Sequence, residues 1–162
     1  MKLLRTIRFD QSDDHVFETA AASDEWAVSG AFEFAELPPD EIKGKTKQAF
    51  ANGFMSLESF GRSTFVSVAT IETDQLARLT DELADHFCRH YGAPDIEAAR
   101  PVATEEIAFA TSLVAEVPIN TVFTVRRTLD DDNAIREEFR TVTPPAAPVH
   151  SKIWDVVDDN DT

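Results

Sequence analysis

The chain has 162 residues, of which 43% are hydrophobic and 28% charged, the balance of a globular protein with its own core. Thirty acidic and 15 basic side chains give a net charge of −15, which disfavours binding to nucleic acids and anionic membranes. The single cysteine, Cys88, excludes an intrachain disulfide, and no stretch has the length and apolarity of a signal peptide or membrane span, so we expect a cytoplasmic protein.

Two stretches near the start have the pattern of β-strands. Residues 2–9 are followed by the turn-forming run DQSDD. Residues 25–35 alternate between large apolar residues and small or polar ones. Gly30 falls in the middle of this second strand, which predicts a bulge or a close backbone approach. The large residues of its apolar face are Trp26, Val28, Phe32 and Phe34.

The next segment predicts a helix and then a hairpin. Two prolines stop the strand, Asp40 is a suitable N-cap, and helical spacing of apolar residues continues to Asn52. Residues 54–71 predict a β-hairpin that turns at Gly61-Arg62, because glycine suits the first position of a type II′ turn. The pairs expected in this register are Met55 with Val68 and Leu57 with Val66.

Two longer helices should follow. The first runs from Thr73 to Tyr91, before Gly92. Residues 102–117 fit strand alternation or a helix, and their length, their alanine content and the Glu105-Glu106 pair in a first turn favour the helix. The apolar stripe of the first helix is Leu76, Leu79, Leu83 and Phe87. The small-residue stripe of the second, suited to close packing, is Thr104, Ala108, Thr111 and Ala115.

Residues 119–143 predict a second hairpin with its turn in the acidic run 130–133. When Leu129 is placed opposite Ile135, apolar residues face apolar ones and opposite charges face each other across the two strands. The further pairs in this register are Val125 with Phe139, Arg127 with Glu137 and Arg126 with Glu138.

Residues 86–91, HFCRHY, are the densest group of potential metal ligands. Each helical residue turns about 100°, so His86 and His90 lie one turn apart, with His90 close to the apolar stripe, whereas Cys88 projects away from His86. A two-histidine zinc site needs a further ligand, and zinc hydrolases place Glu directly after the first His, where this chain has Phe87. We therefore expect no metal at His86 and His90, and assign both to the end of a helix whose dipole favours positive charge.

The stretch KGKTK contains Gly44-Lys45-Thr46, a fragment of a phosphate-binding loop. The full motif needs a glycine five residues before Gly44, where this chain has Pro39. The lysines are therefore assigned to a solvated helix face. No nucleophile elbow, Cys-x-x-Cys pair or glycine-rich dinucleotide turn occurs in the sequence, and we expect no cofactor.

From Pro144 the composition changes, which predicts one domain over residues 1–143 and a tail over 144–162. The tail is a proline spacer followed by a short apolar cluster and a run of acidic residues. Three alternatives fit the cluster: it folds back onto the domain, it docks onto a partner protein with Trp154 as its anchor, or it is disordered. The candidate partner-binding residues are Ile153, Trp154, Val156 and Val157.

Three stretches, KQAFANGF, SFGRSTFV and EEIAFATSL, resemble a family of small bacterial proteins known only as a domain of unknown function. The resemblance covers most of the chain up to the proline spacer. It implies a single compact cytoplasmic domain and assigns a role to no residue.

These observations predict an α+β fold: an antiparallel sheet of five to seven strands, built mainly from hairpins, with two or three helices on one face. For function we expect a non-catalytic accessory or protein-interaction domain, and a homo-oligomer is compatible with the sequence. The alternative is a small enzyme or small-molecule-binding domain with an apolar pocket between sheet and helices. The candidate lining residues are Trp26, Phe32 and Phe34.

Overall fold

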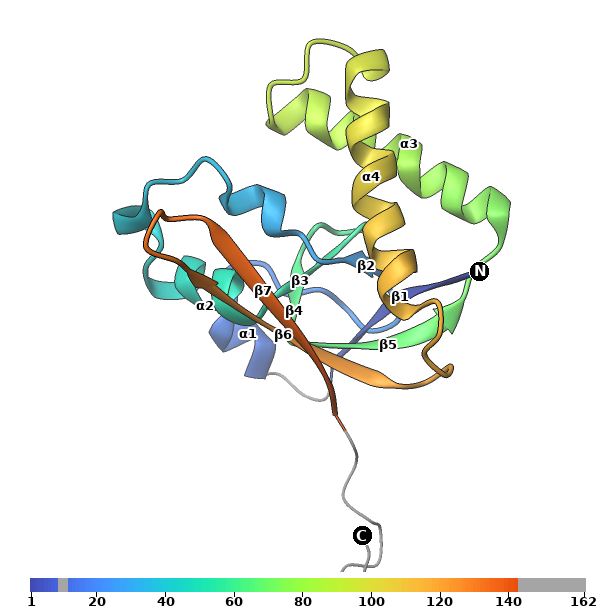
Figure 1. Ribbon diagram of the computed structural model, residues 1–162, viewed down its shortest axis with the longest axis horizontal. Coiled ribbons are helices and arrows are strands. Elements are labelled where there is room, and N and C mark those ends of the chain that lie inside the picture. The colour runs from blue at the N-terminus through green and yellow to red at the C-terminus, as the bar shows by residue number, and fades with distance from the viewer. Residues whose placement is uncertain (9–11, 143–162) are drawn as a thin grey trace, which may run out of the picture.

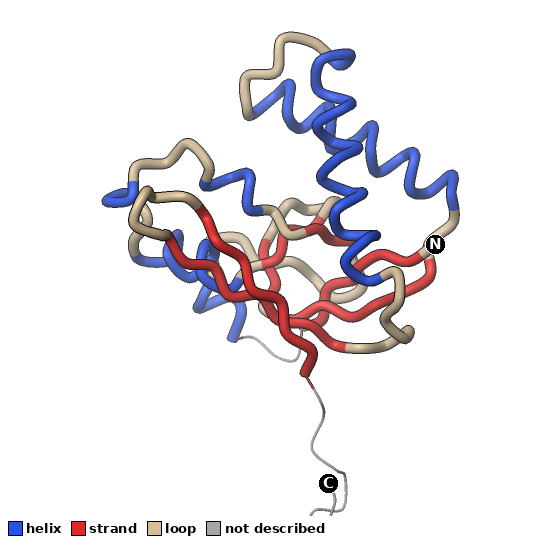
Figure 2. The backbone as a smooth tube through the Cα atoms, in the orientation of Figure 1, coloured by secondary structure: helices blue, strands red, loops and turns tan. Residues whose placement is uncertain are grey.

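The computed structural model describes residues 1–8 and 12–142, and Figure 2 draws the remaining residues in grey. Within the described residues, seven strands form one antiparallel sheet in the order β4-β3-β2-β1-β5-β6-β7. The strands are β1 (Lys2–Ile7), β2 (Trp26–Val28), β3 (Phe54–Ser56), β4 (Arg62–Ser63), β5 (Phe65–Thr70), β6 (Val122–Leu129) and β7 (Ile135–Val142). The helices are α1 (Ser12–Val16), α2 (Gly44–Asn52), α3 (Thr73–His90) and α4 (Ile96–Val114), with 3-10 turns η1 (Ala31–Phe34) and η2 (Pro39–Glu41). The predicted α+β class is confirmed.

The sheet is strongly curled. Four strands separate β3 from β7, so in a flat sheet the two would lie about 24 Å apart, at about 4.8 Å for each of five spacings. Nevertheless the ring centroids of Phe54 on β3 and Phe139 on β7 are 6.2 Å apart. The curl therefore brings the β6–β7 hairpin over β3, as Figure 1 shows, and α2 packs against β6 beside it.

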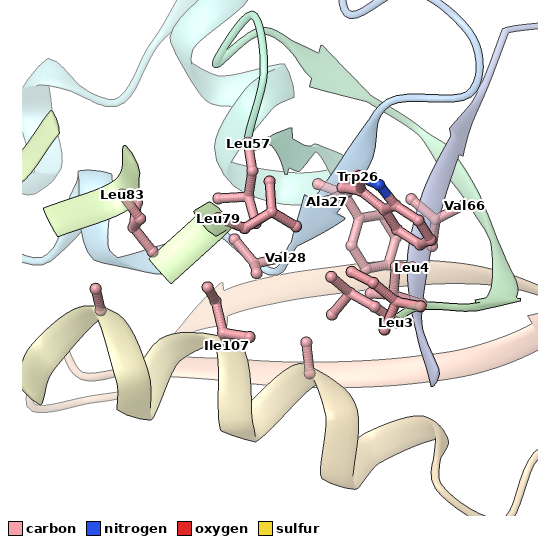
Figure 3. Close-up of a cluster of buried hydrophobic side chains, with 14 of the residues drawn as sticks. Leu3, Leu4, Trp26, Ala27, Val28, Leu57, Val66, Leu79, Leu83 and Ile107 are labelled. Atoms are coloured by element: carbon pink, nitrogen blue, oxygen red, sulfur yellow. The ribbon is translucent and has the colours of Figure 1, made fainter. Parts of the chain in front are cut away.

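The apolar core lies between the sheet and the pair α3 and α4, which pack against each other (Figure 1). Figure 3 shows Leu79 and Leu83 of α3 and Ile107 of α4 in the same buried cluster as side chains of β1 and β2. Helix α4 packs closely against β1 because its buried face carries small side chains, which allow two backbones to come nearer to each other than long side chains do. The buried residues of α4 are Ala99, Ala103, Ile107, Ala110 and Val114.

Several predicted elements are confirmed. The first strand is β1, and the helix expected from Thr73 ends at His90, with a capping box formed by Glu72 and Gln75. The predicted helix in 102–117 is helical as far as Val114. The β6–β7 hairpin has the predicted register at every pair named above, from Leu129 opposite Ile135 to Val125 opposite Phe139.

The predicted strand over 25–35 is wrong beyond Val28. Gly30 adopts the left-handed conformation, with φ +79°, and the chain then forms η1 instead of continuing the sheet. The predicted close approach at Gly30 is correct: a Cβ atom there would lie 2.5 Å from the Met55 Cβ atom. Alternation alone could not show that this glycine turns the chain.

The predicted hairpin over 54–71 is also wrong. The strand β5 pairs with β1, and β3 pairs with β4 in the register that places Met55 opposite Arg62. The turn begins earlier than expected because the Ser56 hydroxyl accepts hydrogen bonds from the amides of Glu58 and Ser59, at 2.9 and 3.1 Å. Consequently Arg62 is a buried strand residue.

Two helix starts and one stripe also differ from expectation. Helix α2 begins at Gly44, with η2 between it and the strand, so Asp40 does not cap it. Helix α4 begins at Ile96, because the Asp95 carboxylate accepts a hydrogen bond from the Ala98 amide at 2.8 Å. The Glu105-Glu106 pair is therefore in mid-helix. The predicted packing stripe of Thr104, Ala108, Thr111 and Ala115 is mostly exposed.

Candidate functional site

A pocket of about 120 Å³ lies between the first half of α2, the turn η1, strand β4 and residues 18–19. It brings together two cations, two carboxylates, two hydroxyls and two aromatic rings. Pockets that hold drug-sized ligands measure roughly 300–1,000 Å³, so this one suits only a small molecule. The lining residues are Glu18, Thr19, Glu33, Phe34, Lys45, Thr46, Ala49, Phe60 and Arg62.

Arg62 forms one wall of this pocket and is held rigidly. Its side chain is 5% exposed and makes an ion pair with Glu33, whose side chain stays 41% exposed. The guanidinium donates to the carbonyl oxygens of Gly53 and Gly30, each at 3.0 Å, and its Cζ atom lies 4.8 Å from the centroid of the Phe34 ring. Burial lowers the pKa of Arg62, and the neighbouring Glu33 carboxylate opposes that effect.

Lys45 and Thr46 enter the pocket from the first turn of α2. The N-cap residue of this helix, Lys43, makes no side-chain capping hydrogen bond, and no acidic residue lies in the first turn. The positive end of the helix dipole therefore adds to the charge of Lys45 on this side of the pocket. Lys47, one residue further along, is exposed and lies outside the lining.

Glu18 completes the charges of the pocket. Within the described residues, neither Glu18 nor Lys45 makes an ion pair, whereas Arg62 and Glu33 pair with each other. The pocket thus holds one free carboxylate and one free ammonium group beside a neutral ion pair. Positive and negative side chains line the pocket in equal number, which favours a ligand that carries both a positive and a negative charge.

A second buried arginine, Arg127, lies next to Arg62. Its side chain is 0% exposed, and both arginines donate to the Gly53 carbonyl oxygen, Arg62 at 3.0 Å and Arg127 at 2.8 Å. Burial, together with the charge of Arg62, lowers the pKa of Arg127 to about 10. Its other partners are the carbonyls of Ser29, Ala49 and Phe50, the Ser29 hydroxyl and the carboxylate of Glu137.

Glu106 of α4 borders the same group. Burial raises the pKa of its carboxyl group, while a hydrogen bond from the Gly30 amide acts in the opposite direction. We call Arg62, Arg127, Glu33, Glu106 and Glu137 the arginine cluster. It ties the turn after β2, the end of α2, β4 and the β6–β7 hairpin together where the curled sheet comes closest to closing.

The aromatic residues at the end of α3 adjoin the pocket. The His86 ring stacks on Phe60, with ring centroids 3.7 Å apart and an interplanar angle of 2°. Burial lowers the pKa of His86, and the adjacent His90 lowers it further. Burial, together with the charge of Glu33, raises the pKa of Tyr91 to about 12.

His86 and His90 have ring centroids 4.8 Å apart. Among residues 1–8 and 12–142, no group of three or more His, Cys, Asp or Glu side chains is arranged to hold a metal ion. His90 is exposed, which corrects its predicted place close to the apolar stripe, and Cys88 is half-buried. His90 and Arg89 lie in the last turn of α3, at the negative end of its dipole.

The three aromatic residues that were predicted to line a pocket lie in different parts of the structure. Phe34 lines the pocket, Phe32 packs against Phe87 and Tyr91, and Trp26 is buried in the core with the Arg5 guanidinium 4.2 Å from its ring. The tail candidates lie outside the described residues. They are Ile153, Trp154, Val156 and Val157.

Sequence reasoning missed both buried arginines. For Arg62 no local signal existed, because Gly61-Arg62 has the composition of an ordinary turn. For Arg127 a signal was present: alternation along β6 places it on the same face as Phe123 and Val125, which are both buried. A charged residue on the inward face of a strand indicates a buried ion pair, and its predicted partner across the hairpin, Glu137, is the one observed.

A family model described as "Family of unknown function (DUF6505)" matches residues 1–155, which confirms the predicted resemblance to a domain of unknown function. No curated protein and no solved structure matches the chain. Among the helices of the described residues, none has the length and apolarity needed to cross a membrane.

Proposed function

The chain belongs to the family of unknown function DUF6505, and from this premise we propose that it is a small-molecule-binding domain whose pocket takes a zwitterion of amino-acid size. One observation carries the proposal: Lys45 and Glu18, each without an ion-pair partner among the described residues, line the same small pocket beside the Arg62–Glu33 pair. A ligand with a carboxylate at one end and an ammonium group at the other satisfies both free charges.

Size and chemistry narrow the ligand further. A pocket of about 120 Å³ is too small for a nucleotide. The guanidinium of Arg62 already binds two carbonyl oxygens and the Glu33 carboxylate, so its charge is satisfied without a ligand. Lys45, the Thr46 hydroxyl and the first turn of α2 bind the carboxylate of the proposed ligand. Glu18 binds its ammonium group, and the rings of Phe34 and Phe60 contact its apolar part.

Thermal shift assays with a panel of amino acids, simple carboxylates, simple amines and inorganic phosphate would test this proposal, followed by calorimetry on the best ligand. We expect a saturable rise in melting temperature for a zwitterion. Lys45→Ala should weaken binding about tenfold, the equivalent of about 1.4 kcal/mol. Lys47→Ala is the matched control, since it removes the same charge from the same helix outside the pocket.

Glu18→Gln distinguishes a zwitterion from a plain anion. The variant should lose affinity for the zwitterion and keep its affinity for the corresponding carboxylate without the ammonium group. If no compound in the panel shifts the melting temperature, or if Lys45→Ala and Lys47→Ala bind equally well, the proposal is wrong.

A second candidate function is docking onto a partner protein through the tail, as a non-catalytic accessory protein in the cytoplasm. The family match favours it, because the match continues for thirteen residues past Val142, the end of β7, and includes Ile153 and Trp154. A segment that belongs to the family unit is a better candidate for a shared role than an unrelated extension.

Removal of residues 144–162 tests the docking role. If docking is the role, truncation leaves the melting temperature within a few degrees of the full chain and abolishes capture of a partner, as Trp154→Ala also does. A fall of many degrees on truncation would instead mean that the tail packs against the domain.

A further inference from the structure

Strand β7 is a long, regular edge of the sheet. It runs for eight residues, from Ile135 to Val142, and pairs only with β6 among the described strands. Its eight pairs with β6 are continuous, without a bulge, and it contains neither proline nor glycine. An edge of this kind presents a row of backbone donors and acceptors that another strand can pair with.

The opposite edge of the sheet lacks these properties. Strand β4 has two residues, Arg62 and Ser63, and both are buried. The backbone of Ala20 also forms an isolated bridge with Arg62 on this edge. The free edge suited to pairing is therefore β7.

The outward side chains of β7 alternate in charge. Arg136, Glu138 and Arg140 are exposed and point away from the face that carries Phe139. When a second β7 is placed antiparallel with Phe139 opposite its own copy, Glu138 of each strand lies opposite Arg140 of the other. Cβ atoms of directly opposite residues are about 4.5–5.5 Å apart, so both pairs are within reach of an ion pair.

We propose that two copies of this chain form a two-fold symmetric dimer by antiparallel pairing of their β7 strands, centred on Phe139. In this register charges of opposite sign meet twice and phenylalanine meets phenylalanine at the axis. A two-fold contact uses the same edge of both copies, so no free β7 edge remains in the dimer and the assembly does not grow into a fibre.

The neighbouring helix contributes a second contact. Phe109 of α4 is 45% exposed, and its ring centroid lies 5.8 Å from that of Phe139. The exposed ring therefore sits beside the proposed axis, where the second copy would bring its own Phe139. Pairing would remove apolar surface from water in addition to forming the strand contacts.

Light scattering on the full chain after size exclusion, over a dilution series, tests the dimer. We expect a mass of twice 18.0 kDa for the wild type. Glu138→Lys places like charges opposite each other at both pairs, and so does Arg140→Glu; each should weaken the dimer at least tenfold. The double variant Glu138→Lys/Arg140→Glu restores opposite charges and should restore the dimer.

Two controls separate pairing from damage to the fold. The lysine introduced by Glu138→Lys would face Arg126 of its own β6 in both the single and the double variant. Glu138 and Arg140 also form an ion pair within one β7, at 3.2 Å, which each single variant breaks and the double variant restores, so melting temperatures are compared at a dilution where every variant is monomeric. Equal melting temperatures at that dilution assign the recovery of the dimer to the second copy. Asp85→Lys/Arg89→Glu reverses an exposed ion pair on α3, away from β7, and should leave the mass unchanged. A monomeric wild type, a single variant that stays dimeric, or a double variant that stays monomeric would overturn the proposal.

Hydrogen exchange gives an independent measurement that needs no variant. In the proposed dimer, amide protection in β7 rises with protein concentration, while protection in β1, at the centre of the sheet, does not. Equal protection of β7 at all concentrations would contradict the proposed interface.

Discussion

Two buried regions of this molecule are held together by different physics. Under α3 and α4 the core is apolar, with Leu83 fully buried. At the nearly closed end of the curled sheet, the arginine cluster buries Arg127 to a similar degree and surrounds it with carbonyl oxygens and carboxylates. Both regions are closely packed, and the second depends on the buried guanidinium of Arg127 keeping its hydrogen-bond partners.

The difference lies in how each region responds to the loss of one group. An apolar core loses stability in proportion to the contacts and volume removed. A buried charge network loses more, because each remaining group keeps its desolvation cost without its partner. The variants below test this contrast.

Arg127→Met should have the largest effect. It leaves the carbonyl of Ser29, three carbonyls around the end of α2, and the Glu137 carboxylate without their shared donor. We expect a loss of about 3–5 kcal/mol in the free energy of unfolding, measured by denaturant titration. Arg126→Met is the control, since this neighbour is exposed, and it should cost below about 0.5 kcal/mol. If Arg127→Met and Arg126→Met lowered the free energy of unfolding equally, the proposed sensitivity of the arginine cluster would be wrong.

Leu83→Ala should cost somewhat less, about 2–5 kcal/mol, because the core can relax partly around the cavity. Leu76→Ala on the same helix should cost clearly less than Leu83→Ala, since Leu76 is only partly buried. The same denaturant titration measures both. A loss at Leu83 well above that of Arg127→Met would reverse the proposed order of the two regions.

Glu106→Gln should have the smallest effect, and a stabilising one. Burial raises the pKa of Glu106 in the folded protein above its value in the unfolded chain. The protonated carboxyl therefore favours folding at low pH, and this contribution is lost as the pH rises through the raised pKa. Glutamine stays neutral and keeps an oxygen for the Gly30 amide, so at pH 7 we expect a gain of about 0.5–2 kcal/mol.

The pH dependence sharpens this prediction. The advantage of Glu106→Gln should shrink as the pH falls and Glu106 becomes protonated in the wild type. Glu105→Gln removes the same charge from the exposed neighbour, and should show neither the gain nor its pH dependence. Melting temperatures across a pH series measure both variants.

The sequence predicted the parts of the fold that depend on local pattern. The β6–β7 register follows from pairs such as Arg127 with Glu137, which lie close along the chain and can be compared directly. The stripe of α3 follows from helical periodicity, and Leu79, Leu83 and Phe87 are buried as expected.

The parts that failed depend on contacts between distant segments. Pairing of β5 with β1 joins residues more than sixty positions apart in places, and no local pattern favoured it over the nearer hairpin. The pocket brings together Glu18, Lys45 and Arg62 from three separate segments. Each is an ordinary charged residue in its own stretch, and only the folded arrangement makes them neighbours.

The shared carbonyl of Gly53 has a consequence for the order of folding. Arg62 and Arg127 lie far apart along the chain, and both bind the oxygen at the junction of α2 and β3. The β6–β7 hairpin can form early from local contacts, and Arg62 is only nine residues from Gly53, whereas the junction gains its second donor, Arg127, only after distant segments have met. We therefore expect closure of this end to be a late kinetic event, so that Arg127→Met accelerates unfolding far more than it slows folding.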